Sequence, residues 1–228
     1  MTMIGDKLQQ VRARIVTACT AAGRDPASVH LLAVSKTFAA EAVREAHAAG
    51  QTAFGENYVQ EGVAKIEALA DLRSQLEWHC IGPLQSNKTR VVAEHFDWVH
   101  SIDRLKIAER LAEQRPAHLP PLQVCLQINV DGGANKSGIG AEEAISLAQA
   151  VAALPRLRLR GLMAIPEPAP DFAAQRDLFL RAAAVFDQIR ASGIELDTLS
   201  LGMSADLEAA VAAGSTMVRI GTAIFGSR

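Results

Sequence analysis

Short apolar segments recur along this chain, and a segment with helical spacing follows nearly every one of them. Most are continuous apolar runs rather than strict apolar–polar alternations, which is typical of parallel strands covered on both faces. Eight candidate strands result: 31–37, 52–57, 76–82, 98–103, 122–130, 157–166, 198–204 and 215–226. Eight strand–helix units can close into a barrel or lie open as a doubly wound sheet.

Two observations favour the barrel. No GxGxxG motif follows the first strand, so the usual mark of a dinucleotide-binding sheet is absent. Eight near-equal units within about 200 residues suit a small (β/α)8 barrel of the TIM type. Residues 2–22 add an N-terminal helix, with apolar Leu8, Val11, Ile15 and Ala18 at helical spacing. No linker interrupts the series, so we expect an α/β fold with one domain over residues 1–228.

Composition excludes several classes of protein. The net charge of −2 and the lack of a basic block argue against nucleic acid or an acidic membrane surface as a partner. Three dispersed cysteines predict neither a disulfide framework nor a zinc site, and no spacing of carboxylates predicts another metal. No signal sequence and no apolar run of about 18 residues is found, so we expect a cytoplasmic protein.

Polar residues stand at the expected carboxyl ends of the strands, where barrel enzymes carry their chemistry. These positions are Lys36, Asn57, Gly82, Asn129, Met163, Ser204 and 219–222. Lys36 ends an apolar strand, so we expect its amine at the barrel mouth, partly removed from water. Such an amine is nucleophilic and forms imines with carbonyl compounds. The alternative is a strand-end lysine whose amine reaches solvent.

The last two units predict an anion site. Gly221 lets backbone N–H groups approach a phosphate, and Ser204 and Thr222 add hydroxyl donors. The loops after strands seven and eight of such barrels often hold a phosphate, although the glycines can equally serve tight packing. Arg219 can donate to a ring nitrogen of a bound heterocycle, or form a salt bridge near the chain terminus. A reactive lysine facing this site suggests an aldehyde that carries a phosphate.

Several motifs in order resemble the pyridoxal-phosphate homeostasis protein family, whose members look like the barrel domain of alanine racemase. They are AVSKT (33–37), FGENYVQE (54–61), WHCIGPLQSNK (78–88), GLMAIP (161–166) and the segment 199–226. The resemblance implies pyridoxal 5′-phosphate (PLP) bound to Lys36 as an internal aldimine. It further implies Asn57 and Met163 beside the cofactor, Arg219 at the pyridine nitrogen, and three residues on the phosphate: Ser204, Gly221 and Thr222. The chain departs from the family at Phe38, Cys80 and Gly133.

The resemblance leaves open whether the chain is an enzyme. Racemisation needs an acid or base on each face of the reacting carbon. Alanine racemases supply one from a tyrosine of a second domain, which we expect to be absent because the sequence ends just after the eighth unit. The only tyrosine here, Tyr58, is expected to pack or to face solvent, and the six histidines are expected to be core or surface residues. We assign no catalytic residue.

The interpretation is therefore a protein that stores, protects or delivers PLP and influences amino- and keto-acid balance indirectly. Apo-PLP-dependent enzymes are the expected acceptors, and a monomer is expected. The first alternative is a weak amino-acid racemase that uses His79 or water as its second base. The second alternative is a class I aldolase acting on a phosphorylated sugar through Lys36. Lys136 is either a second functional lysine near the mouth or an ordinary loop lysine.

Overall fold

The fold is a closed barrel of eight parallel strands in sequential order, β1 to β8. The computed structural model describes residues 2–132 and 137–226. The strands are β1 (His30–Val34), β2 (Ala53–Glu56), β3 (Glu77–Cys80), β4 (Trp98–Ile102), β5 (Leu122–Gln127), β6 (Leu157–Met163), β7 (Thr198–Ser200) and β8 (Met217–Ile220). Four residues of β8, from Met217 to Ile220, pair with His30 to Ala33 of β1 and close the barrel. The predicted (β/α)8 barrel is confirmed.

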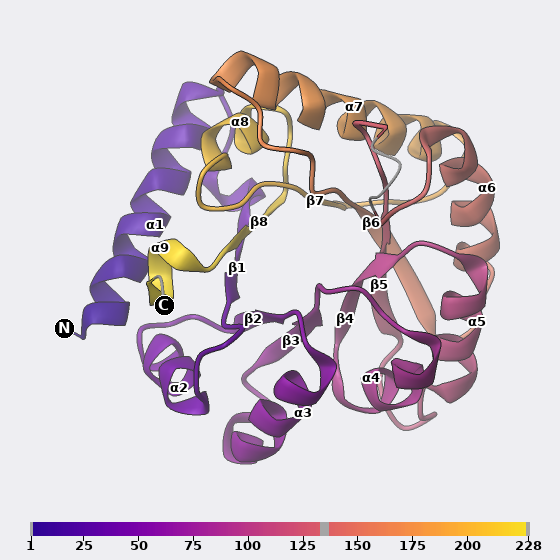
Figure 1. Ribbon diagram of the computed structural model, residues 1–228, viewed down its shortest axis with the longest axis horizontal. Helices are drawn as coiled ribbons and strands as arrows, with labels where there is room; N and C mark the ends of the chain where they lie inside the picture. The colour runs from indigo at the N-terminus through magenta and orange to yellow at the C-terminus, as the bar shows by residue number, and fades with distance from the viewer. Residues whose placement is uncertain (1, 133–136, 227–228) are drawn as a thin grey trace.

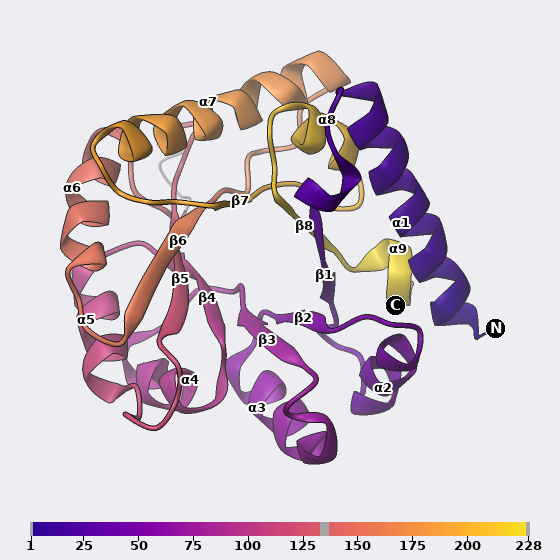
Figure 2. The same ribbon diagram turned by 180° about the vertical axis from the view of Figure 1, so that it is seen from behind.

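Helices surround the strands, as Figures 1 and 2 show from opposite sides. They are α1 (Met3–Ala21), α2 (Ala40–Ala48), α3 (Val59–Ala68), α4 (Thr89–His95), α5 (Leu105–Gln114), α6 (Ala141–Ala152), α7 (Phe172–Ala191), α8 (Leu207–Ala212) and α9 (Thr222–Phe225). Each helix buries an apolar stripe against the outer face of the barrel, and these stripes form most of a single hydrophobic cluster. None of the described helices is long and apolar enough to cross a membrane.

The N-terminal helix α1 completes the helical layer beside β1 and β8. Its first turn is capped by Thr2, whose side chain accepts a hydrogen bond from the Gly5 amide. Leu8, Val11 and Ile15 are buried on one face, as their spacing predicts. The helix packs against α2, α8 and α9 (Figure 1). Because α8 and α9 are short, α1 covers the barrel surface where those two helices do not reach.

The eighth strand is shorter than the sequence predicts. β8 ends at Ile220, and residues 222–225 form the helical turn α9 instead of continuing the strand to 226. The apolar residues Ile224 and Phe225 are buried from a helix rather than from a strand. A run of four apolar or small residues does not by itself distinguish these two structures. This turn brings Gly221 and Thr222 to the carboxyl end of the barrel.

The barrel interior is unusually polar for a packed core. His79, His100, Ser200 and Arg219 are all buried, on β3, β4, β7 and β8 respectively. They lie among apolar residues such as Met163 and Cys125. A buried polar group is costly unless it is hydrogen-bonded, so these four side chains must be paired with one another or with the backbone.

Candidate functional site

A cavity of about 490 Å³ opens at the carboxyl end of the barrel. It brings together six of the seven residues that the sequence singled out: Lys36, Asn57, Ser204, Arg219, Gly221 and Thr222. Its walls include the apolar side chains of Phe38, Ile81, Ile165 and Met203. Among the described lining residues, Lys36 and Arg219 carry the only ionisable side chains, and both are basic. The cavity therefore favours an anionic ligand with an apolar, flat body.

Lys36 lies in the loop after β1 rather than in the strand itself. The strand ends at Val34, and the Lys36 side chain is exposed. Lys36 lines the cavity but is open to solvent, so partial removal of its amine from water stays a prediction. The next residue, Thr37, has φ +68, a left-handed conformation that non-glycine residues rarely adopt. The turn that presents Lys36 must therefore be held by its surroundings.

A buried ion pair beneath this turn supplies that support. The ammonium of Lys65 on α3 lies 2.7 Å from Glu56 Oε1, 2.8 Å from Glu61 Oε1 and 2.7 Å from the carbonyl oxygen of Ser35. Glu56 also accepts a 2.6 Å hydrogen bond from the Ser35 hydroxyl, and Glu61 accepts one of 2.5 Å from the Thr37 amide. The residues on both sides of Lys36 are thus bound to one charged cluster.

Burial changes the acidity of this cluster. It raises the pKa of Glu56, and the hydrogen bonds from Lys65 and Ser35 act in the opposite direction. The Glu56 side chain is fully buried and that of Lys65 is 6% exposed. Removing one partner would therefore leave the other as an uncompensated charge in the interior.

The N-terminal helix supports the opposite wall of the cavity. Arg14 of α1 donates to the Ser204 carbonyl oxygen at 3.2 Å and 3.3 Å. The same guanidinium forms an ion pair with Glu208 of α8 at 2.9 Å. Within the loop, the Asp206 carboxylate accepts from the Met203 amide at 2.6 Å. Two sets of contacts therefore hold the loop that carries the Ser204 hydroxyl: the Arg14 guanidinium of α1 and the hydrogen bond between Asp206 and Met203 inside the loop.

Gly221 meets the first strand at this end of the barrel. A Cβ atom built at this position would lie 3.0 Å from the Val34 carbonyl oxygen, so a side chain would require a shift of the β1 backbone. The close approach places Gly221 and Thr222 beside the loop that follows β1. Lys36 therefore faces the residues predicted to hold a phosphate across one cavity.

Arg219 lies at the floor of the cavity and is 3% exposed. Its guanidinium donates to the Ser200 carbonyl oxygen at 2.5 Å, to the Ser200 hydroxyl at 2.8 Å and to the Ala164 carbonyl oxygen at 3.0 Å. No carboxylate among the described residues pairs with it, and oxygen atoms of Ser200 and Ala164 hold the guanidinium instead. Burial lowers the pKa of Arg219 to about 10, and the side chain remains cationic at neutral pH.

Two of the described residues discussed from the sequence, Met163 and Tyr58, do not line this cavity. Met163, at the end of β6, is fully buried against Trp98 and Cys125 and does not belong to the cavity lining, because its side chain packs inside the barrel. Tyr58 precedes α3 and is 61% exposed, so it agrees with the expectation of a solvent-facing tyrosine. Lys136 and Gly133 lie outside the described residues.

His100 is a core histidine, one of the two kinds expected, but its contact with Ser200 beside Arg219 was not predicted from the sequence. His100 is fully buried in the middle of β4, where its Nδ1 lies 3.0 Å from the Ser200 hydroxyl. Burial, with His79 and Arg219 nearby, holds the pKa of His100 far below its ordinary value of 6.5. Its spacing of two from Trp98 was the available signal, since alternate residues of a strand share a face, and the two rings lie 5.8 Å apart.

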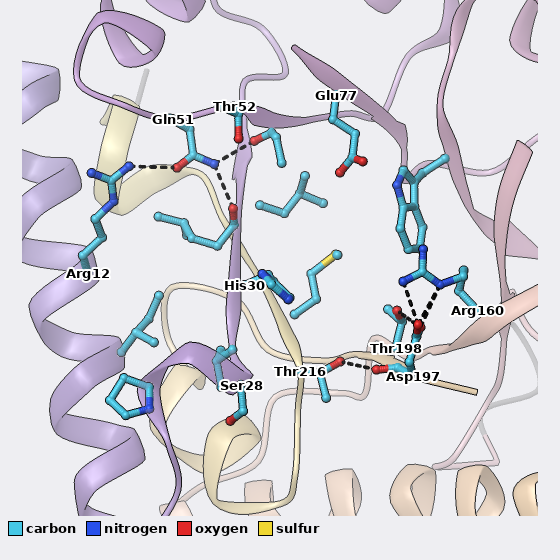
Figure 3. A pocket seen from close by; sticks show the side chains of 18 of the residues that line it. Arg12, Ser28, His30, Gln51, Thr52, Glu77, Arg160, Asp197, Thr198 and Thr216 are labelled. Atoms are coloured by element: carbon cyan, nitrogen blue, oxygen red, sulfur yellow. Dashed lines mark hydrogen bonds and ion pairs between the residues drawn. The ribbon is translucent and has the colours of Figure 1, made fainter. Parts of the chain in front are cut away.

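A second cavity, of about 630 Å³, opens at the amino end of the barrel and is larger than the first. Figure 3 shows two of its charged groups bound to protein partners: Arg160 binds Asp197, and Arg12 binds Gln51. The Arg12 guanidinium also donates to the carbonyl oxygens of Ala49 and Gly50. In barrels of this type the amino end serves stability, whereas the carboxyl end carries the chemistry. We therefore take the smaller cavity as the candidate site.

Comparison with known proteins agrees with this choice. The sequence profile of the alanine racemase N-terminal domain matches residues 7–228. The chain is 61% identical to the pyridoxal phosphate homeostasis protein of Pseudomonas aeruginosa, over all of this chain and 97% of that protein. It is 59% identical to the protein of the same description in Escherichia coli, over all of this chain and 98% of the relative.

Among solved structures, PipY of Synechococcus elongatus with PLP bound is similar over 98% of this chain and 100% of that one. The TM-score is 0.85 and the sequence identity is 38%. Fold, the residues gathered at the carboxyl end of the barrel and full-length similarity to these proteins agree. This chain belongs to the alanine racemase N-terminal domain family, and within it to the pyridoxal phosphate homeostasis proteins.

Proposed function

We propose that this chain binds PLP in the cavity at the carboxyl end of the barrel and serves intracellular PLP homeostasis. The observation that carries the proposal is that Lys36 and Arg219 line the same cavity. No carboxylate is among the described residues that line it. A phosphorylated aldehyde on an aromatic ring needs an amine, an anion site and apolar walls. The names of the relatives and the PLP-bound PipY structure support the same ligand.

The residues present fit the cofactor group by group. When bound, PLP supplies an aldehyde that reacts with amines and a conjugated ring that accepts electron density. Lys36 provides the amine, and the Ser204 and Thr222 hydroxyls with the backbone at Gly221 provide donors for the phosphate. Arg219, which is cationic at neutral pH, would donate to the ring nitrogen and keep a proton off it. Asn57 and the apolar walls would border the ring.

The same lining favours a carrier over a racemase. A racemase needs a second acid or base on the far side of the reacting carbon. Lys36 and Arg219 are the only ionisable groups among the described lining residues, and the pKa of Arg219 is too high for it to act as a base near pH 7. His79 is buried below the cavity floor, on the side of Ser200 away from Arg219. We therefore expect slow or no exchange of the amino-acid Cα hydrogen with deuterated water.

The test is the visible absorption spectrum of the purified protein incubated with PLP. We expect a band that borohydride bleaches in the wild type and in Lys106→Ala, which removes an exposed lysine on α5, but not in Lys36→Ala. A colourless wild type would overturn the proposal of PLP binding, and a normal spectrum for Lys36→Ala would overturn the assignment of the lysine. A sugar phosphate bound by an aldolase would give no such band.

The homeostasis role extends beyond binding. We propose that the protein is a cytoplasmic monomer that passes PLP to apo-PLP-dependent enzymes. The exposure of Lys36 supports exchange, because an incoming amine can reach it without opening the barrel. Delivery is tested by mixing the PLP-loaded protein with an apo-enzyme and following the activity that appears. Activity should appear faster than with the same amount of Lys36→Ala that has been incubated with PLP. Sedimentation velocity tests the monomer.

A further inference from the structure

A line of hydrogen bonds crosses the barrel interior from the amino-end cavity to Arg219. Glu77 Oε1 lies 2.8 Å from His79 Nε2, and His79 Nδ1 lies 2.9 Å from His100 Nε2. His100 Nδ1 lies 3.0 Å from the Ser200 hydroxyl, which in turn accepts from Arg219 at 2.8 Å. β4 and β7 are not neighbours in the sheet, so the bond between His100 and Ser200 spans the barrel.

The middle of this line of hydrogen bonds is shielded from solvent. His79, His100 and Ser200 are fully buried, and the indole of Trp98 stacks on the His79 ring with centroids 5.0 Å apart. Only the Glu77 end is open: its side chain is 49% exposed and points into the amino-end cavity (Figure 3). Hydrogen bonds in such surroundings are stronger than in water and polarise one another.

The two ends of the line fix its direction. A guanidinium only donates and an ionised carboxylate only accepts. Burial by itself would raise the pKa of Glu77, but the His79 hydrogen bond and the nearby Arg160 hold that pKa below its usual value, so Glu77 is ionised at neutral pH. His79 Nε2 must then carry a hydrogen. With both rings neutral, His79 Nδ1 accepts from His100 Nε2, and His100 Nδ1 accepts from the Ser200 hydroxyl.

The alternative arrangement is distinct. A proton added to His79 Nδ1 would donate to His100 Nε2 and move the His100 hydrogen to Nδ1, where it would donate to Ser200. The Ser200 hydroxyl would then accept from both His100 and Arg219 and would have to turn its own hydrogen elsewhere. The charged groups around His79 are Glu77 on β3, Arg160 on β6 and, beyond His100, Arg219 on β8. The ring nitrogen of His100 that carries the hydrogen therefore shows which of the two arrangements is present.

We propose that Glu77, His79, His100 and Ser200 form a one-directional hydrogen-bonded relay that positions Arg219 and links the amino-end cavity to the ligand in the carboxyl-end cavity. Glu77, His79 and His100 are positioning residues, since they act on the ligand only through Ser200 and Arg219. The relay rests on the proposed placement of the PLP ring against Arg219, but its hydrogen-bond direction is a property of the protein alone.

The direction is tested first, without ligand. Two-bond proton–nitrogen correlation spectra of the histidine-labelled protein distinguish the two neutral forms of each ring from the cation. We expect the single hydrogen of His100 on Nε2, where it donates to His79 Nδ1, at neutral pH. A hydrogen on His100 Nδ1 would overturn the relay as drawn. Exposed His118, which lies outside this line of hydrogen bonds, provides the reference ring.

The link is tested by a double-mutant cycle between Glu77 and Ser200, which do not touch. Glu77→Gln keeps the shape but lets the side chain donate, and Ser200→Ala removes the hydroxyl but keeps the carbonyl that Arg219 also uses. In the wild-type background, we expect Glu77→Gln to weaken PLP binding at least about five-fold, which is a typical coupling between two sites. In the Ser200→Ala background, the same substitution should weaken binding less than about two-fold. Independent effects of the two substitutions would overturn the link.

A control variant distinguishes a long-range effect of the Glu77 charge from coupling through the hydrogen bonds. Asp197→Asn removes a carboxylate at the same end of the barrel that binds Arg160 and not His79, so PLP affinity should not change. An equal loss in this variant would mean that Glu77 acts only through long-range charge. If Lys36→Ala shows that PLP is not bound there, the proposed function fails, whereas the histidine spectra still decide the direction of the relay.

Discussion

At the scale of single residues, the position of Lys36 depends on a buried charge cluster rather than on the strand that precedes it. Lys65 neutralises Glu56 and Glu61 and binds the Ser35 carbonyl oxygen, so it joins α3 to the turn that carries Lys36. The motif FGENYVQE supplies both carboxylates, so these acidic residues serve the ion pair with Lys65.

Replacement of Lys65 by Met should be strongly destabilising. It leaves Glu56 buried without its cation, so we expect a loss of about 3–5 kcal/mol in the free energy of unfolding. Urea denaturation measures it. Lys106→Met on the surface is the control and should change stability little. Adding Glu56→Gln to Lys65→Met should recover part of the loss, and no recovery would contradict the role of the ion pair.

A glycine on the other side of Asn57 gives a second prediction. A Cβ atom at Gly82 would lie 2.1 Å from the Asn57 carbonyl oxygen, so Gly82→Ala must displace the backbone that carries Asn57. We expect a destabilisation of about 1–3 kcal/mol and weaker PLP binding. Gly140→Ala, where no atom lies within 4 Å of the added group, should cost less and leave binding unchanged. Equal effects on binding would argue against this contact.

At the scale of elements, α1 supports the site as well as covering the barrel. Arg14 binds the Ser204 carbonyl oxygen and Glu208 from a largely solvated position, with 37% of its side chain exposed. Such surface pairs contribute little to stability. The helix therefore matters to the cavity mainly through the position of the Ser204 loop.

Replacement of Arg14 by Gln should separate stability from binding. We expect a loss below about 1 kcal/mol in unfolding free energy but a several-fold weaker affinity for PLP, measured by absorbance titration. Arg44→Gln is the matched control, since it breaks a surface pair between Arg44 on α2 and Asp71 in the turn after α3, and it should leave affinity unchanged. Unaltered affinity in Arg14→Gln would show that the loop holds its shape without α1.

At the scale of the whole molecule, the buried histidine at the barrel centre should make stability depend on pH. The pKa of His100 lies far below 6.5 in the folded state, so the unfolded chain binds more protons as the pH falls through 6.5. Stability contributed by neutral His100 is therefore complete above this value and declines below it.

This pH dependence can be measured by difference. Between pH 7.5 and pH 5.5 the wild type should lose about 1.4 kcal/mol more unfolding free energy than His100→Gln, which has no group to titrate there. His118→Gln, at an exposed position, should behave as the wild type. Parallel pH profiles for the wild type and His100→Gln would show that His100 is protonated in the folded protein.

The sequence by itself determined the barrel and the composition of the cavity. Eight apolar runs with helical segments between them fix the strand order, and in a parallel barrel the carboxyl ends of all strands meet at one end. Lys36, Ser204, Gly221 and Thr222 could be grouped on that ground alone. Arg219 was also found, because its place in an apolar strand, two residues before Gly221, is visible in the sequence.

Only the tertiary structure decided how these groups are held. Whether Lys36 is buried depends on where β1 ends, and whether Met163 meets the cavity depends on how the interior of the barrel packs; neither is encoded in local periodicity. The bonds from Lys65 to Ser35 and from His100 to Ser200 join residues 30 and 100 positions apart. Such contacts arise from barrel closure and strand register, which bring distant residues together only after the whole chain has folded.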